Sequence, residues 1–348
     1  MNLLNEVMGM VVLELMLPIA AYQCMALLRR LPKNHPSRPI IERDLKSWLK
    51  GYYGEKECSY YLSLLPEEQY YIFHGLRLTD KKEFQIDLLI LCQRFALIAE
   101  VKNLSKKLIF KKESNSVTKE FNNEEEGISN PILQVKRQKI QFVNWLGKVQ
   151  MKGLPIERLV VISKTTTKIE TTPNNLQIFN ELIYAESLLD KLEELEMKYG
   201  KPTFNKRKIG QLVDLLLAHH HTPIPDILQK YKLAKDDIRS GVLCPKCQTV
   251  EMSYYSGKWH CLKCQLASKT AYFQAVDDYF LLINPTITRK QFGEFLHIEH
   301  TLIAGNLLRA LNLTSTGSKR GTSYSLPKNQ LLCPLDELGI NLYNVPVR

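Results

Sequence analysis

Two short apolar runs that contain charged residues constrain the fold of this chain most. The first is Gln-Ile-Asp-Leu-Leu-Ile-Leu at 85–91, and the second is Phe-Ala-Leu-Ile-Ala-Glu-Val-Lys at 95–102. Short runs rich in Ile and Leu are typical of buried strands. A buried charge is costly unless it is paired or holds a metal. Because Asp87, Glu100 and Lys102 interrupt or end these runs, we expect them to form a site.

The turn between the two runs decides whether these charges meet. If a tight turn is centred on 93–94, Asp87 lies opposite Glu100, and Lys102 shares the face of Glu100. A shift of one residue would place the carboxylates on opposite faces. Gln-Arg lacks the Gly, Asn or Asp that two-residue turns favour, so a longer loop stays open. Two carboxylates and a lysine suit a metal-dependent phosphodiesterase, and the alternative is a buried Glu100–Lys102 pair that only neutralises itself.

Length and charge limit the classes of protein. At 348 residues, the chain has room for two or three domains. Lys and Arg outnumber Asp and Glu by 47 to 36, which gives a net charge of +11 and an isoelectric point near 9.1. A polyanion is the natural partner of such a surface, nucleic acid first and an anionic membrane second.

The cysteines fall into two classes. Four of the eight are scattered, and the other four form the pairs Cys244-Pro-Lys-Cys247 and Cys261-Leu-Lys-Cys264, which are separated by thirteen residues. Paired knuckles of this kind supply four thiolates to a tetrahedral Zn²⁺, so the spacing predicts a zinc ribbon. Nothing resembles a disulfide framework, which favours a reducing compartment, the cytoplasm.

Aromatic and basic residues lie between the two knuckles, at Tyr254, Tyr255, Lys258, Trp259 and His260. Such residues on a ribbon stack on bases and meet phosphates, which makes Lys258 and Trp259 candidates for nucleic-acid binding. The alternative for Trp259 is packing in the small core of the ribbon. The sequence leaves both open.

Residues 286–326 resemble a winged helix-turn-helix. Thr288 is placed to cap a first helix that ends at Leu296, residues 297–300 form a turn, and 301–311 form a second helix. A Gly-rich segment at 314–326 then fits a wing, with Lys319 and Arg320 at its tip to contact DNA. The alternative is a plain helical hairpin with a basic loop.

The N-terminal residues 7–28 are apolar enough to raise the question of a membrane anchor. Glu14, Pro18 and Gln23 interrupt the run, so we expect a packed strand and helix instead. A membrane-tethered protein is kept as a third alternative.

The order of the remaining segments indicates a mixed α/β domain. We expect a connector at 30–41, a helix from about 42 to 65 interrupted by Gly51 and Gly54, and a strand at 70–73 before the two central strands. A hairpin at 106–130, a helix at 131–147 and a strand at 158–163 follow. The expected domains are an N-terminal extension (1–37), the α/β domain (38–200), a helical linker (201–240), the zinc ribbon (241–270) and the winged-helix-like module (271–348).

Several short motifs in the α/β domain resemble the nuclease-related domain, NERD, of the PD-(D/E)XK nuclease superfamily. They are Gly51-Tyr-Tyr-Gly54-Glu55, Ile86-Asp87, Glu100-Val-Lys-Asn103 and Asn130-Pro-Ile-Leu-Gln134, within residues 35–165. Ile86-Asp87 replaces the Pro-Asp of the superfamily name. The resemblance implies a restriction-endonuclease-like mixed sheet flanked by helices.

The resemblance also implies a role for each matched residue. Asp87 and Glu100 would bind Mg²⁺ or Mn²⁺, with the carbonyl of Val101 as a possible third ligand. Lys102 would activate the attacking water, Glu55 would complete the acidic cluster, and Gln134 would point at the scissile phosphate or its water. The expected function is therefore a cytoplasmic DNA nuclease, and the alternative is a DNA-binding regulator whose nuclease-like domain no longer cuts.

Overall fold

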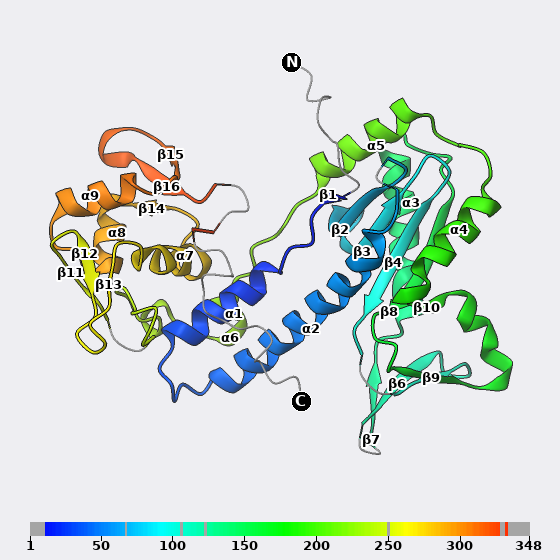
Figure 1. Cartoon of the computed structure of the whole chain (residues 1–348), viewed down its shortest axis with the longest axis horizontal. Coiled ribbons are helices and arrows are strands. Elements are labelled where there is room, and N and C mark those ends of the chain that lie inside the picture. Colours follow the sequence, from blue (N-terminus) through cyan, green and yellow to red (C-terminus); the bar gives the residue numbers. More distant parts are fainter. Residues whose placement is uncertain are drawn as a thin grey trace. The chain divides into compact units, whose positions relative to one another are not determined.

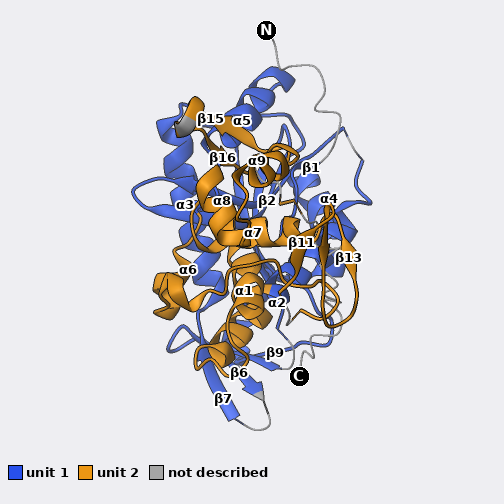
Figure 2. Ribbon diagram, turned by 90° about the vertical axis from the view of Figure 1, so that its left-hand side faces the viewer, with its two compact units in different colours: residues 1–17, 49–223 blue, residues 18–48, 224–348 orange. Residues whose placement is uncertain are grey.

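The computed structural model describes residues 11–66, 68–104, 107–121, 124–248, 251–327 and 331–332, with only the backbone described for Phe121 and Arg320. The chain divides into two compact units, coloured in Figure 2. Unit 1 contains residues 1–17 and 49–223, and unit 2 contains residues 18–48 and 224–348. The long helix α2 (Arg38–Leu62) therefore contributes residues to both units.

A six-stranded mixed sheet forms the centre of unit 1, in the order β1-β2-β3-β4-β8-β10 (Figure 1). Its strands are β1 (Val11–Leu13), β2 (Tyr71–Thr79), β3 (Glu83–Leu91), β4 (Ala96–Lys102), β8 (Ile156–Ile162) and β10 (Leu182–Tyr184). β2, β3 and β4 are antiparallel neighbours, whereas β8 runs parallel to both β4 and β10. β4 therefore lies inside the sheet, with a partner on each side.

Helices cover both faces of this sheet. On one face, Val135 and Phe142 of α3 (Pro131–Lys148) and Ile209 and Leu212 of α5 (Lys206–His219) pack into one apolar core. On the other face, Cys58 of α2 and apolar residues of α4 (Leu188–Lys198) form a second core. The expected α/β fold with a mixed sheet between helices is confirmed.

A smaller sheet extends from the ends of β4 and β8. Its order is β7-β6-β5-β9, from β7 (Glu124–Ile128), β6 (Ser116–Phe121), β5 (Lys107–Lys111) and β9 (Lys168–Thr171). β5 follows β4 along the chain and pairs in parallel with β9, which follows β8. The segment expected as one hairpin at 106–130 is thus three strands, because the parallel β4–β8 pairing continues into β5 and β9.

Unit 2 begins with α1 (Ile19–Arg30), which packs with α6 (Ile227–Tyr231) and with α7 (Tyr272–Leu282). The apolar N-terminal stretch is therefore the strand β1 and the helix α1 over its described residues, as expected. No helix among the described residues is long and apolar enough to span a membrane.

The C-terminal part of unit 2 contains two small modules that share one apolar core. The first is a three-stranded sheet of β11 (Ser253–Tyr255), β12 (Lys258–His260) and β13 (Ala267–Ser268). The second contains α7, β14 (Ile287–Thr288), α8 (Arg289–Leu296), α9 (Thr301–Arg309), β15 (Thr314–Thr316) and β16 (Ser323–Ser325). Its strands form a sheet in the order β14-β16-β15. The Thr288 side chain caps α8 and pairs with Gln291, so the predicted helix start is confirmed.

Two expected elements have different bounds in the structure. β2 continues to Thr79 instead of ending at Phe73. Gly75, with a φ of +60°, shifts the alternation of buried residues, so the sequence pattern does not indicate the second half of the strand. α2 runs without a break from Arg38 to Leu62, so the predicted connector ends earlier, and Gly51 and Gly54 do not interrupt the helix. A glycine costs only about 1 kcal/mol in a helix, which packing can offset.

The grouping into units also differs from the predicted domain boundaries. The expected boundary at residue 200 falls before α5, whose apolar face belongs to the core of unit 1. Residues 201–219 are therefore part of the α/β unit and not a linker. Residues 18–48, expected in an extension and in the α/β domain, belong to unit 2.

Gly54 lies where α2 comes closest to the ends of β4 and β8. A Cβ atom at this position would be 2.5 Å from the Cβ of Asn103 and 3.2 Å from the hydroxyl of Ser163. Asn103 fastens the same contact, since its Nδ2 donates a hydrogen bond of 2.6 Å to the carbonyl of Lys50 on α2. Only a residue without a side chain permits this approach, so Gly54 fixes α2 against the sheet.

We expect Gly54→Ala to destabilise unit 1 by about 1–3 kcal/mol, since the added methyl group overpacks a rigid contact. Gly51→Ala is the matched control: nothing lies within 4 Å of a Cβ there, so alanine should be neutral or stabilise the helix by up to about 1 kcal/mol. Urea unfolding followed by circular dichroism measures both. Equal effects of the two substitutions would contradict the close approach.

A buried ion-pair cluster holds α1 against α7 in unit 2. Asp278 accepts hydrogen bonds from Arg29 at 2.6 Å and from Arg30 at 2.8 Å. Arg30 also donates to the carbonyls of Arg239 and Gly241. The side chains of Arg30 and Asp278 are each 1% exposed, so each charge depends on its partners.

We expect Asp278→Ala to lower the free energy of unfolding of unit 2 by about 3–5 kcal/mol, because it leaves Arg30 charged and buried. The control is Glu294→Gln, which removes an exposed pair with Lys290 at 3.7 Å and should cost less than about 0.5 kcal/mol. Thermal and urea unfolding compare the two variants, and a mild Asp278→Ala would contradict the assigned role.

Candidate active site and zinc site

The ladder between β3 and β4 ends one residue before the two predicted acids. Leu88 pairs with Ala99 and Leu91 with Ala96, and Asp87 and Glu100 follow directly after the Leu88–Ala99 pair. The turn is the tight one, closed by a 3.0 Å bond from the amide of Cys92 to the carbonyl of Phe95. The predicted register is thus confirmed for residues 88–91 and 96–99.

The side chain of Asp87 accepts a hydrogen bond from a backbone amide of β4, just beyond the end of this ladder. Its Oδ2 accepts a hydrogen bond of 3.1 Å from the amide of Val101, the residue between Glu100 and Lys102. The carboxylate of Asp87 therefore lies against the strand segment that carries the other two predicted residues.

Glu100 is 1% exposed, and both of its oxygens have partners. Lys102 Nζ lies 2.5 Å from Oε1, and Gln138 Nε2 donates a hydrogen bond of 2.7 Å to Oε2. Lys102 also donates to Gln134 Oε1 at 3.2 Å, and its side chain remains 23% exposed. The cluster therefore reaches the surface at the lysine.

The ion pair that the alternative interpretation expects is present, but it does not neutralise the cluster. Burial, then the charges of Glu100 and Glu55, raise the pKa of Asp87 well above its usual range. Burial and the charge of Glu100 raise the pKa of Glu55 to about 7. Three carboxylates thus share one ammonium group, an imbalance that a divalent cation would relieve.

α3 supplies two amides to the site, and the sequence motifs predict only one of them. Gln134 was predicted and contacts Lys102. Gln138 lies one helical turn later on the same face, where it bonds Glu100 and the carbonyl of Gln85. The i, i+4 spacing on the helix was the available signal.

His74 is another buried polar residue, and it lies on the side of the sheet that α2 covers. Burial lowers the pKa of His74 to about 4, so the imidazole is neutral, and its Nε2 lies 3.4 Å from the hydroxyl of Ser59 on α2. No sequence motif points to this histidine, because it stands alone in an apolar strand.

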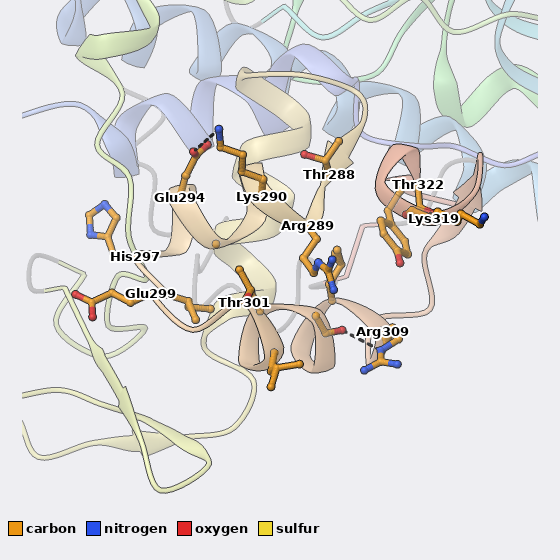
Figure 3. Close-up of a pocket in the computed structure, with 17 residues that line it drawn as sticks. Thr288, Arg289, Lys290, Glu294, His297, Glu299, Thr301, Arg309, Lys319 and Thr322 are labelled. Carbon is orange, nitrogen blue, oxygen red and sulfur yellow. Dashed lines mark hydrogen bonds and ion pairs between the residues drawn. The ribbon is translucent and has the colours of Figure 1, made fainter.

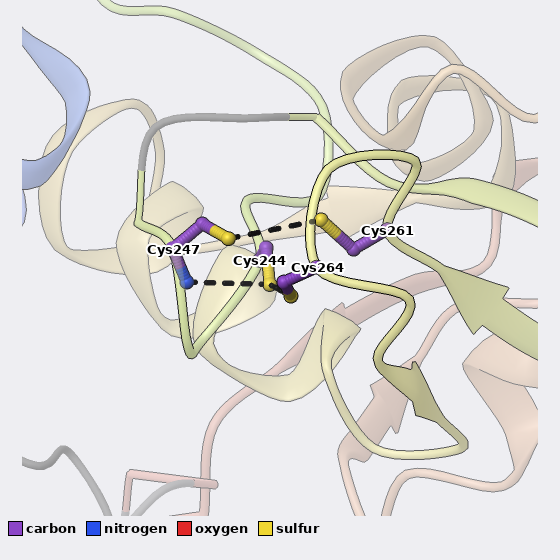
Figure 4. A group of neighbouring side chains, drawn as sticks. All are labelled: Cys244, Cys247, Cys261 and Cys264. Atoms are coloured by element: carbon purple, nitrogen blue, oxygen red, sulfur yellow. Dashed lines mark hydrogen bonds between the residues drawn. The ribbon is translucent and has the colours of Figure 1, made fainter.

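The four knuckle cysteines meet as predicted (Figure 4). All four sulfur atoms lie within 4.8 Å of one another, with Cys244 and Cys264 3.6 Å apart and Cys247 and Cys261 4.0 Å apart. Tetrahedral Zn²⁺ with bonds of about 2.3 Å requires sulfur separations of about 3.8 Å. The residues therefore fit zinc.

The two knuckles have the same backbone turn. The residue after each pair, Gln248 and Gln265, has a positive φ, and each amide bonds the carbonyl of the first cysteine of its pair. Among the described residues, these cysteines are the single group of three or more potential ligands gathered this closely. The carboxylates around Asp87 are more widely spaced, which suits Mg²⁺, since that ion uses one or two carboxylates and keeps several waters.

Trp259 packs in the core and is not a nucleic-acid contact in this structure. It is 1% exposed and lies against Tyr254 and Tyr272, with ring centroids 5.1 and 6.2 Å away. Of the two alternatives for this residue, core packing is the correct one, because its side of β12 faces inward. Lys258, the other candidate, is exposed.

The predicted wing contributes to a groove of about 1240 Å³ between α8, α9 and β16 (Figure 3). Lys319 lines this groove, together with three basic residues that the sequence motifs did not indicate, Arg289, Lys290 and Arg309, and with the acids Glu294 and Glu299. The side chain of Arg320 lies outside the described residues.

One part of the chain matches a known protein family. The family model of the nuclease-related domain, NERD, matches residues 50–163. No curated protein and no solved structure matches the chain. The matched segment includes Glu55, Asp87, Glu100, Lys102 and Gln134. The chain therefore contains a nuclease-related domain, which spans residues 50–163 and holds the acidic cluster.

Proposed function

We propose that this chain is a metal-dependent nuclease that hydrolyses phosphodiester bonds in DNA. The nuclease-related domain suggests a nuclease-related function. The observation that best supports hydrolysis is the cluster of Asp87, Glu100 and Glu55 beside a single partly exposed ammonium group, Lys102. A purely structural ion pair would need no further carboxylates.

Asp87 and Glu100 are the residues that would hold Mg²⁺ or Mn²⁺, since both are hard oxygen donors from adjacent strands. When bound, the ion would polarise the phosphate and lower the pKa of a coordinated water. The backbone carbonyl of Val101 is a further potential oxygen ligand.

Lys102 is positioned to hydrogen-bond the attacking water or the phosphate. Its ammonium group is fixed by Glu100 and Gln134, so one of its three donors remains to hydrogen-bond a reacting oxygen. Gln134 orients this lysine, and its own amide NH₂ group can donate to the phosphate or its water. Glu55, with a pKa near 7, is suited to exchange a proton at neutral pH.

The modules of unit 2 are proposed to hold the nucleic acid. The order of α7, β14, α8, α9 and the β15–β16 hairpin, with the sheet order β14-β16-β15, supports a winged helix-turn-helix. In that fold the second helix of the motif, here α9, enters the major groove while the wing contacts the backbone. The basic groove between α9 and Lys319 supports duplex DNA as the partner. Zn²⁺ bound by the four cysteines would hold the neighbouring ribbon folded.

The second candidate is a DNA-binding regulator whose nuclease-related domain does not cut. The retained Asp87, Glu100 and Lys102 favour the enzyme over this alternative. The cytoplasm fits both, because zinc thiolates and free buried cysteines require reducing conditions.

We expect Asp87→Asn and Lys102→Ala each to lower the rate of plasmid cleavage in Mg²⁺ or Mn²⁺ by about 10²-fold or more, because each removes a group required in the transition state. Cleavage is measured by conversion of supercoiled plasmid to nicked and linear forms.

Glu83→Gln and Lys82→Ala are the matched controls for these variants. Both residues lie near the other end of β3, where Glu83 pairs with Arg77, and they should leave cleavage unchanged. Wild-type protein that binds DNA but never cuts it with either metal would favour the regulator instead.

Phosphate contacts in the groove should appear in the salt dependence of duplex binding. Lys319→Ala should weaken binding and reduce the slope of log K against log salt concentration by about 0.9, the value for one phosphate contact. The comparison is Lys235→Ala, an exposed lysine outside the groove, which should leave the slope unchanged. Fluorescence anisotropy in the absence of divalent cations measures binding without cleavage, and an unaltered slope for Lys319→Ala would exclude it from the interface.

A further inference from the structure

The β11–β12 hairpin of the zinc ribbon has two different faces. Tyr254 pairs with Trp259 across the ladder, and both rings face the apolar core. Because side chains alternate along a strand, Tyr255 and Lys258 point to the other side, as do Ser253 and His260.

The outer face presents an ordered aromatic surface. Tyr255 is 52% exposed, and its ring stacks on His260 with centroids 3.8 Å apart and planes inclined by 13°. The turn that follows Tyr255 has two residues, Ser256 and Gly257, and both have a positive φ. This is a type I′ turn, whose twist matches that of the flanking strands. The ring is therefore held at the tip of a short, rigid hairpin and needs little ordering when a ligand arrives.

The charge around this ring suits an anion. The module at 241–270 has one carboxylate, Glu251, and it pairs with His297 at 2.5 Å. Its four lysines are all exposed, and they are Lys246, Lys258, Lys263 and Lys269. Lys258 lies directly across the ladder from Tyr255. One open aromatic face with an ammonium group beside it matches a base and its phosphate.

We propose that the outer face of this hairpin, centred on Tyr255 and His260, binds unpaired bases of a nucleic acid strand. Within a duplex, each base face is covered by its neighbours, so only a single-stranded segment can offer a base to Tyr255. If the chain is the proposed nuclease, it follows that its substrate includes a single-stranded region, and only this consequence rests on the proposed function. The binding itself does not depend on cleavage.

The test compares a labelled oligo(dT) with a blunt duplex of the same length, by fluorescence anisotropy of the zinc-loaded full chain without Mg²⁺ or Mn²⁺. Tyr255→Ala should weaken oligo(dT) binding about tenfold, the loss expected when one base loses its stacking partner. Duplex binding should be unchanged, and Tyr255→Phe, which keeps the ring, should bind oligo(dT) as the wild type does. Tyr60→Ala, which removes an exposed tyrosine from α2, is the matched control and should have no effect.

Zinc content keeps the result interpretable. One thiolate-bound zinc per chain in Tyr255→Ala shows that its ribbon is folded. If Tyr255→Ala loses its zinc, Tyr255→Leu serves as the second variant, because leucine suits a strand but lacks a π face. Wild-type affinity of the folded variant for oligo(dT), or equal affinity of the wild type for an abasic strand, would overturn the proposal. Plasmid cleavage is scored separately, so loss of stacking and absence of nuclease activity are distinguishable.

Discussion

The burial of Glu100 is the constraint on which the candidate active site depends. β4 lies between two partner strands, so a carboxylate on it is buried and must be paired. Lys102 and Gln138 each take one of its oxygens. Lys102 is thus already paired with Glu100, while burial and the charge of Glu100 raise the pKa values of Asp87 and Glu55. The fold thus accepts an excess of acid that costs stability, which is expected where a divalent cation binds.

Three separate elements hold this cluster in place. The β3–β4 ladder ends next to Asp87 and Glu100, where Asp87 accepts a bond from the amide of Val101, and α3 presents its amides one turn apart on one face. The third element is α2, which carries Glu55 and is brought close by Gly54. Glu55 directly follows Gly54, so this carboxylate lies next to the close contact of α2 with Asn103 and Ser163. The glycine therefore acts through packing, although it touches none of the charged groups that the site is built from.

Much of the nuclease-like site was predictable from sequence because its signals are local. The alternation of two apolar runs and a two-residue turn sufficed to predict the register of β3 and β4, and the CxxC pairs sufficed to bring the four cysteines together. The misjudged features depend on contacts distant in sequence. Gly54 suggested a helix break because its contact with Asn103, which is distant in the sequence, cannot be recognised from the neighbouring residues. The sequence alone does not decide between the two roles of Trp259, since the core beneath a three-residue strand sets which of its faces is buried.

The acidic cluster is relevant to the proposal that the modules of unit 2 hold the nucleic acid. Lys102 is paired with Glu100, so the site offers a phosphate backbone little net positive charge. The adjoining strands add little attraction, because lysines such as Lys107 and Lys119 are paired with glutamates there. The groove beside α9 and the ribbon lysines carry a basic excess instead. In the proposed function, affinity and chemistry therefore belong to different parts of the chain, because a cation-binding acidic site and a polyanion-binding surface require opposite local charge.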